Sequence, residues 1–484
     1  MNRLKINNLA HGMVLTGIIL SGLLQSCSSS KTQQRQDVIP IITKALSDKS
    51  SMFYTDFKTY PKARKNLAIG VFDSGTGGLT VLEKLLVCDE YDNSTGAEYP
   101  DGIPDFINEN FNYVGDIANM PYGNYAAENK SDYLRELVIR DALFLLKDRP
   151  SKIIVVACNT ATAYGLNDIA SLLQKSGTGI RVIGVINAGV NAALSSLDRN
   201  KDYAIGVMAT PGTIASNAYE RTLLKMKDEM GFKGQIIVVN QSGRGFAESV
   251  DGEKDFTDRS LTEVCDNYRG PVCGAGEADI NPSLLDVYHF DTSGHALLTK
   301  QSADGKLHVQ LNSSGNYARF HLVSLMEKYR LSGQTIPLKR IILGCTHYPF
   351  LLDTLNATIN ELRNYQKDGQ FIYKPLIAED FEFIDPALFT AKECYEALRN
   401  SDQLIAEEQT NSVNAYISVP SPELPADKLD RDGSLIYTFK YGRTPGKEEQ
   451  TTVFVPFSRQ VVGNEVMQRL ELLVPESFKL IMKK

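Results

Sequence analysis

The chain has 484 residues, of which 43% are hydrophobic and 23% are charged, the proportions of a soluble globular protein. Its formal net charge is −7, and no basic patch with interleaved aromatic residues occurs, so we expect no nucleic-acid partner. The length is sufficient for two or three domains of roughly 150 residues each.

The N-terminal segment has the features of an export signal. A basic start precedes an apolar run over 13–24, too short for a spanning helix of roughly 20 residues but suited to a secretory signal. The run ends in LLQSC, which resembles the lipobox of bacterial lipoproteins, where cleavage exposes a cysteine that receives lipid. We therefore expect a signal peptide over 1–26, lipidation of Cys27, a tether over 27–65, and an exported lipoprotein anchored on the periplasmic side of a membrane. A plain secretory signal with an incidental Cys27 is the alternative.

From Asn66 the sequence alternates short apolar runs with segments of helical spacing. The apolar run LAIGVF is followed by the turn DSGTGG and then by LTVLEKLLV, which has helical spacing. Three further apolar runs, KIIVVAC, IRVIGVI and YAIGVMA, each precede a segment of helical spacing. Two more apolar runs, GQIIVV and KRIILGC, complete the set. Continuous apolar strands alternating with helices predict an α/β fold with buried parallel strands. Ligands of such sheets gather at the carboxyl ends of strands. The polar clusters at such ends are Asp73-Ser74, Cys158-Asn159-Thr160, Thr210-Pro211 and Cys345-Thr346-His347.

Three segments interrupt this alternation. Residues 89–106 are acidic and rich in turn formers, but their spacing does not match the calcium ligands of an EF-hand. Residues 251–335 are interpreted as a polar insertion, and they contain four of the six histidines at irregular spacing. The tail after Asn400 contains SLIYTFKY and TTVFVPF, which are typical of strands, and SVPSPELPADKLDRDG, which is typical of a loop.

Seven cysteines occur in the chain. Cys265 and Cys273 lie close together in a polar segment, and in an exported protein they are the pair that we most expect to form a disulfide. Connectivity cannot be read from spacing alone.

Cys158 and Cys345 occupy matching positions, in KIIVVACNTA and KRIILGCTHY. A buried cysteine often only fills space, but the polar side chains that follow each of these would need partners if they were buried as well. A zinc site made of both cysteines with Asp73 and His347 is a second interpretation. The third is acid–base chemistry, because a thiol can carry a proton when charge or hydrogen bonding tunes its pKa.

The acid–base interpretation fits these neighbours best, with His347 and Asp73 as the tuning groups. Two thiols on opposite faces of one carbon would remove a proton from one side and deliver one from the other, which is racemisation without a cofactor. The sequence shows no lysine motif for pyridoxal phosphate and no phosphate loop, so we expect no cofactor and no metal.

Five motifs in order carry a family resemblance. IGVFDSGTGGLTVL, YVGDIANMPYG, VVACNTATA, IGVMATPGTIASNAYERTL and IILGCTHYPFL resemble those of glutamate racemases in the aspartate/glutamate racemase family. The resemblance spans about 66–360, with EFIDPALFTA near Asp385 as a weaker sixth block. It implies two pseudo-symmetric α/β domains with parallel sheets and an active site in the cleft between them. We place the first domain at 66–183 and 375–484, and the second at 184–374, with the insertion at 251–335.

The resemblance also implies roles for individual residues. Cys158 would serve the D-enantiomer and Cys345 the L-enantiomer, with His347 assisting Cys345. Asp73 and Ser74 would hold the amino end of the substrate. The residues implied to bind its carboxylates are Tyr122, Gly123, Asn159, Thr160 and Thr346.

The implied function is cofactor-independent interconversion of L- and D-glutamate. Histidine after GCT favours glutamate, because aspartate racemases usually carry glutamate there. The family supplies cell-wall synthesis in the cytoplasm, whereas this chain has an export signal, so free or wall-derived amino acids outside the cytoplasm are the substrates to consider. Asn187 and Ala188 replace the usual Glu-Pro, which leaves open another amino acid as substrate. A tethered binding protein without turnover and a one-thiol decarboxylase relative are the other hypotheses, and a homodimer is the assembly to test.

Overall fold

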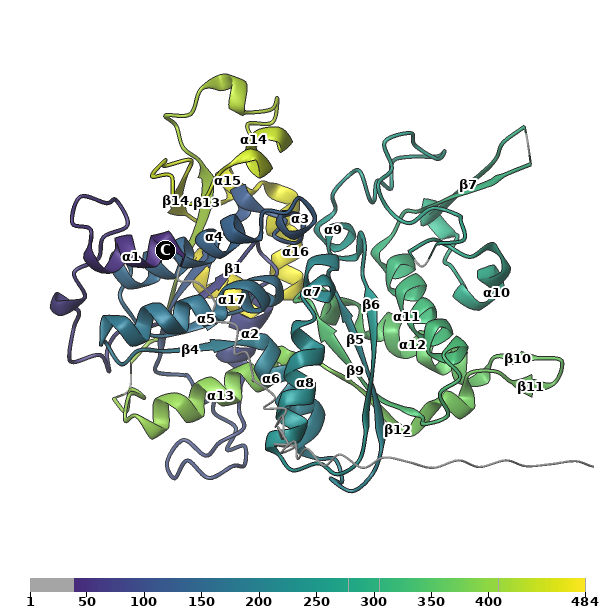
Figure 1. Cartoon of the computed structure of the whole chain (residues 1–484), viewed down its shortest axis with the longest axis horizontal. Helices are drawn as coiled ribbons and strands as arrows, with labels where there is room; N and C mark the ends of the chain where they lie inside the picture. The colour runs from purple at the N-terminus through teal and green to yellow at the C-terminus, as the bar shows by residue number, and fades with distance from the viewer. Residues whose placement is uncertain (1–38, 277, 304, 408, 484) are drawn as a thin grey trace, which may run out of the picture. The chain divides into compact units, whose positions relative to one another are not determined.

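The computed structural model describes residues 39–276, 278–303, 305–407 and 409–483 (Figure 1). The predicted signal peptide and the predicted lipidation site Cys27 lie outside these residues. Within the predicted tether, helix α1 (Pro40–Ser47) buries Ile41 and Ile42 in the protein core. Among the described helices, none has the length and apolar character that crossing a membrane requires.

The larger sheet of the described chain has six strands in the order β14–β13–β2–β1–β3–β4. All neighbouring strands in it are parallel except β13 and β14, which pair antiparallel at one edge. The bounds are β1 (Ala68–Asp73), β2 (Asn110–Gly115), β3 (Ser151–Val156), β4 (Arg181–Gly184), β13 (Ser412–Pro420) and β14 (Thr452–Pro456). The C-terminal part of the chain therefore returns to complete a sheet that the N-terminal part begins.

The second sheet has four parallel strands in the order β12–β9–β5–β6. Its strands are β5 (Tyr203–Ala209), β6 (Ile236–Ser242), β9 (Leu338–Gly344) and β12 (Ile377–Ile384). Two small hairpins, β7–β8 (Leu297–Gln301 and Leu307–Leu311) and β10–β11 (Gln366–Lys367 and Gln370–Phe371), lie outside both sheets. The predicted α/β fold with parallel sheets is confirmed, whereas the domain boundaries stay a prediction.

Helices cover both faces of each sheet. Val71 of β1 belongs to a core cluster with α2 (Leu79–Val87), α13 (Pro386–Asn400), α16 (Asn464–Leu473) and α17 (Pro475–Met482). The next residue, Phe72, belongs to another cluster with α4 (Ser131–Leu143) and α5 (Asn159–Ser176). Successive strand residues point to opposite faces, so a continuous apolar run is what a doubly covered sheet requires.

The smaller sheet repeats this arrangement. Ile341 and Leu343 of β9 pack with α11 (Ser314–Leu331) and α12 (Leu352–Asn364). Ile342 between them packs on the other face with α6 (Val185–Ser195) and α8 (Ala218–Glu229). Figure 1 shows these two helices on the side of the sheet opposite to α11 and α12. The remaining helices are α3 (Gly123–Ala127), α7 (Pro211–Ala215), α9 (Phe246–Asp251), α10 (Leu285–Tyr288), α14 (Tyr437–Gly442) and α15 (Arg459–Val462).

The predicted insertion 251–335 contains α11, a helix whose Tyr317 and Phe320 are fully buried, and its bounds stay a prediction. The structure corrects two other expectations about the less regular segments. The second half of SLIYTFKY lies in α14 rather than in a strand, whereas TTVFVPF is the expected strand, β14, which pairs with β13. Cys265 and Cys273 are free thiols rather than a disulfide.

Candidate active site

One cavity gathers every residue that the sequence analysis assigned to catalysis or substrate binding. It lies at the carboxyl ends of strands from both sheets: Asp73 ends β1, Cys158 follows β3, and Cys345 follows β9. The predicted residues on its wall are Asp73, Ser74, Tyr122, Gly123, Cys158, Asn159, Thr160, Cys345, Thr346 and His347. The wall also contains Met120, Pro121, Asn124, Thr210, Pro211, Ala247, Glu248, Asp251 and Glu253.

Glycines allow the loops of the two sheets to meet around this cavity. A Cβ atom on Gly77, in the turn after β1, would lie 2.4 Å from Cε1 of His347 and 2.6 Å from Oγ1 of Thr346. A Cβ atom on Gly212 would lie 2.7 Å from Cα of Gly123. Both distances are far below a normal van der Waals contact, so these close approaches require glycine.

Cys158 is a protonated thiol in this environment. It precedes α5, where its Sγ accepts a hydrogen bond from the Ala161 N–H at 3.4 Å and donates to Ser74 Oγ at 3.5 Å. Burial, together with the charge of Asp73, raises the pKa of the Cys158 thiol to about 12, although the Ala161 N–H and Ser74 oppose this. The sulfur therefore holds its proton at neutral pH.

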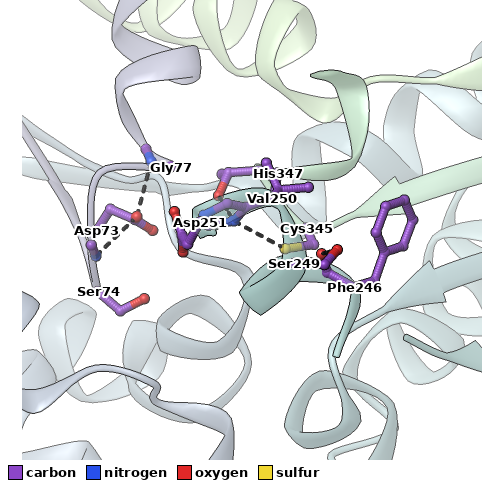
Figure 2. Close-up of polar contacts among 12 residues, drawn as sticks. Asp73, Ser74, Gly77, Phe246, Ser249, Val250, Asp251, Cys345 and His347 are labelled. Carbon is purple, nitrogen blue, oxygen red and sulfur yellow. Dashed lines mark hydrogen bonds and ion pairs between the residues drawn. The ribbon is translucent and has the colours of Figure 1, made fainter. Parts of the chain in front are cut away.

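Cys345 has the opposite electrostatic environment. Its Sγ lies 3.5 Å from Nδ1 of His347, and Nε2 of the same ring lies 3.0 Å from Oδ2 of Asp251 (Figure 2). The second contact is an ion pair rather than a well-aligned hydrogen bond.

The charges of this ion pair reinforce each other. Burial lowers the pKa of His347, but the charge and contact of Asp251 outweigh burial and raise it well above its ordinary value. Burial raises the pKa of Asp251, but His347 and Arg469 outweigh that effect, so it lies below its ordinary value. The pair is thus an imidazolium and a carboxylate, and it places a cation beside the Cys345 sulfur.

Asp73 is held by the turn that follows β1. Its Oδ2 accepts hydrogen bonds from the N–H groups of Gly75 at 3.1 Å and Gly78 at 2.9 Å. Burial raises the pKa of Asp73, although the charge of His347 and the backbone N–H groups oppose the rise. The carboxylate disfavours ionisation of Cys158, so its influence on that thiol is to keep it protonated.

Neutral hydrogen-bonding groups form another part of the wall. The hydroxyls of Thr160, Thr210 and Thr213 form a triangle with Oγ1–Oγ1 distances of 3.2, 3.1 and 3.0 Å. Asn159 Oδ1 accepts a hydrogen bond from the Tyr219 hydroxyl at 2.5 Å, which leaves its amide N–H groups as donors. Hydroxyls and amide donors are suited to binding a carboxylate.

Tyr122 does not present its hydroxyl to the cavity. The hydroxyl is within 2.5 Å of Asp116 Oδ2 and 2.7 Å of Asp141 Oδ2. The backbone of Tyr122 and Gly123 is therefore the part of this loop that can meet a ligand.

Sequence reasoning missed three acidic residues of the wall, Glu248, Asp251 and Glu253. They lie on or just after α9, where the predicted polar insertion begins at residue 251 and Glu248 precedes it. The one available signal was position, because α9 follows the carboxyl end of β6. In the described part of the chain, no group of three or more His, Cys, Asp and Glu side chains is arranged to hold a metal ion.

Known proteins similar to this chain are glutamate racemases, although no family model matches. The Bacillus cereus glutamate racemase is 31% identical over 52% of this chain and 77% of its own length. The Lactobacillus helveticus enzyme is 32% identical over 46% of this chain and 69% of its own length. The Oceanobacillus iheyensis enzyme is 38% identical over 34% of this chain, and that match spans only half of the relative.

Solved structures give a weaker likeness. A glutamate racemase of Bacillus anthracis is 24% identical with a TM-score of 0.44, over 73% of this chain and 88% of its own. A glutamate racemase of Francisella tularensis, solved in complex with D-glutamate, is 22% identical with a TM-score of 0.40. This match covers 72% of this chain and 88% of the other.

Proposed function

This chain belongs to the glutamate racemase family, and from that premise we propose that it interconverts L- and D-glutamate by transferring protons through Cys345 and Cys158. The observation that carries the proposal is electrostatic. Two thiols lie on the wall of one cavity, Cys345 beside the His347 cation and Cys158 in a setting that keeps it protonated. A racemase needs one base and one acid at the start of each turnover.

The first half of the reaction uses Cys345 as the base. Its thiolate takes the Cα proton of the L-enantiomer, and the electron pair of the broken C–H bond is delocalised into the α-carboxylate. The Cys158 thiol then gives its proton to the opposite face of Cα. Cys345 ends as a thiol and Cys158 as a thiolate, which the Ala161 N–H and Ser74 stabilise.

The reverse reaction starts from the exchanged protonation states. The thiolate of Cys158 then takes the proton of the D-enantiomer, and Cys345 delivers one from the other face.

The neutral part of the wall supports the choice of an acidic amino acid. The hydroxyls of Thr160 and Thr210 with the amide of Asn159 offer donors for one carboxylate, and the backbone around Gly123 offers donors for the other. The carboxylate of Asp73 would meet the amino group. The residues of the cavity supply the acid–base groups, so the proposed reaction requires no cofactor.

The test is a panel of amino acids with the purified protein, including glutamate, aspartate and glutamine of both configurations. Chirality is followed by circular dichroism without added cofactor, in parallel with and without chelator and a carbonyl-trapping reagent. We expect glutamate to racemise under all of these conditions. Binding of glutamate without any change in chirality would establish the tethered binding protein instead, and loss of activity with chelator, restored by zinc, would favour a metal site.

The placement of the protein is a separate proposal that rests on the LLQSC junction. We infer that the chain is exported and anchored through lipid on Cys27. The native protein should then partition with membranes, and Cys27→Ser should yield a soluble exported form. Recovery of an uncleaved cytosolic protein would contradict export.

A further inference from the structure

The C-terminal helix α16 reaches the segment that carries Asp251. Arg469 of this helix donates from Nη1 to the carbonyl oxygen of Val250 at 2.9 Å and from Nη2 to Oδ1 of Asp251 at 3.0 Å. A single planar guanidinium thus holds the backbone and the side chain of the last turn of α9. Such a two-point contact fixes direction as well as distance.

Asp251 lies between two cations. Its Oδ1 meets Arg469 and its Oδ2 meets His347 Nε2, each at 3.0 Å. The Asp251 side chain is 13% exposed and the Arg469 side chain 23% exposed, so solvent screens these contacts less than it screens surface ion pairs. Because Arg469 occupies one carboxylate oxygen, the other oxygen is left facing the imidazole.

We propose that Arg469 is a positioning residue for the Cys345 half of the active site, acting through Asp251 and His347. The chain of contacts runs from a guanidinium on α16 to a carboxylate on α9, then to an imidazole and to the Cys345 sulfur after β9. This inference rests on the proposed function. It gives the C-terminal helices a role in the reaction in addition to their packing.

A purely structural role for Arg469 is the competing explanation. The attachment of α16 to the core comes from Met467 and Leu470, which are buried in the cluster beneath β1. Loss of one partly exposed guanidinium leaves that packing in place. A change in the active-site chemistry at unchanged stability is therefore what distinguishes positioning from packing.

The charges that face Asp251 define how its protonation changes when Arg469 is removed. They are the cations Arg469 and His347 and the acidic groups Glu248 and Glu253. Removing Arg469 takes away a cation that favours the charged carboxylate and frees the carboxylate to turn from His347. Both changes make Asp251 easier to protonate.

The experiment compares Arg469→Gln and Arg469→Lys with a matched control, Arg459→Gln. Arg459 lies in the neighbouring helix α15, and its guanidinium contacts Asn464 Oδ1 at 3.2 Å. We expect Arg469→Gln to lower kcat by about 10- to 100-fold, the scale found for the partners that orient metal-ligating histidines, with a smaller change in KM. Arg469→Lys keeps the charge but loses the two-point contact, so it should recover part of the loss. Arg459→Gln should match the native protein.

Two further measurements distinguish a failure of the positioning role of Arg469 from a failure of the proposed function. The acid limb of the kcat/KM profile should move to higher pH in Arg469→Gln. The carboxyl ¹³C titration of Asp251, assigned with Asp251→Asn, should shift to higher pH in the same direction, and it does not depend on turnover. If the native protein racemises glutamate but Arg469→Gln equals Arg459→Gln in kcat, acid limb and titration, the positioning role is wrong. A native protein that does not racemise refutes the proposed function, while the titration still tests the contact.

Discussion

Nε2 of His347 and Oδ2 of Asp251 lie 3.0 Å apart, although one residue follows β9 and the other ends α9 after β6. The ion pair places a cation next to the sulfur of Cys345. On the other side, the charge that acts on Cys158 is that of Asp73, which raises the pKa of the thiol. The two thiols of the cavity are thus matched in sequence and opposite in electrostatics, which is the difference that a directional proton transfer needs.

Replacement of either thiol should stop racemisation in both directions. The incoming proton must arrive from the face opposite the departing one, so Cys158→Ala and Cys345→Ala should each abolish interconversion while leaving much of glutamate binding. Chirality over time and calorimetric binding measure the two effects, with Cys273→Ala as the control because Cys273 is a free thiol outside the cavity.

In D₂O the native protein should place deuterium at Cα of the product. A Cys345→Ala protein that racemises at the native rate would refute the mechanism.

The two thiols should differ in reactivity toward alkylation. Both are 6% exposed, so access does not separate them, but Cys158 has a pKa raised to about 12 by burial and Asp73, and the thiolate is the reactive form. At pH 7.5, iodoacetamide should therefore modify Cys345 before Cys158, as read by peptide mass spectrometry, and glutamate should protect both. In Asp251→Asn the preference should shrink, because His347 loses its partner. Faster modification of Cys158 would contradict the assignment of base and acid.

The alternation of strands and helices and the residues of the cavity were predictable because both are local in sequence. Apolar runs such as KRIILGC mark buried parallel strands, and the polar residues that follow lie at one sheet edge by geometry alone. Strand β13 was not predicted, because its pairing with β2 depends on a contact between distant parts of the chain. Helix α11 falls within the polar segment 251–335 with its four histidines, and composition alone does not reveal that Asn316, Tyr317 and His321 of this helix are buried.

The acidic groups around His347 could not be predicted for a related reason. Asp251 becomes functional only because α9 turns it toward a residue far along the chain, and Arg469 reaches it from a third segment. Neither spacing nor composition indicates such an ion pair. The partners of the Tyr122 hydroxyl could not be predicted either, because the two buried carboxylates that accept its hydrogen bonds lie in different elements.

The Asp251–His347 pair should stabilise the fold over a defined pH range. The pKa of His347 is raised from 6.5, so its contribution is complete below that value and is lost as pH rises through the folded-state pKa. The pKa of Asp251 is lowered from 3.8, so its contribution is complete above that value and is lost as pH falls through the folded-state pKa. Between pH 4 and 6.5 both contributions are present.

Urea unfolding of Asp251→Asn, His347→Asn and the double variant measures this effect. The coupling free energy of the double-mutant cycle should be greatest between pH 4 and 6.5 and should decline at higher and lower pH. A coupling that does not change with pH would show that the two groups do not form an ion pair.

Glu253 should make glutamate binding depend on pH. Burial, with the neighbouring charges of Glu248 and Asp251, raises the pKa of Glu253 to about 7, and the side chain lines the cavity. Above pH 7 its ionisation adds a negative charge that repels an anionic substrate, so KM for glutamate should rise between pH 6 and 8.5. Glu253→Gln should flatten this rise, whereas Glu263→Gln, an exposed residue outside the cavity wall, should retain it. A pH dependence that survives in Glu253→Gln would assign it to another group.

Gly77 should be intolerant of even a methyl group, because the turn after β1 lies against the His347 ring. A Cβ atom there would lie 2.4 Å from His347 Cε1 and 2.6 Å from Thr346 Oγ1, so Gly77→Ala must push the ring away from Cys345 or separate the loops that enclose the cavity. A displacement of about 1 Å at a catalytic group can cost on the order of 10²-fold in rate, and we expect kcat to fall by about that factor. Gly315→Ala is the control, since its Cβ would meet no atom within 4 Å. The ¹⁵N resonances of the His347 ring should shift in Gly77→Ala and not in Gly315→Ala. A Gly77→Ala protein with native kcat and unshifted ¹⁵N resonances of the His347 ring would mean that the turn can move aside. The close approach of the two loops would then not be needed to hold His347 beside the Cys345 sulfur.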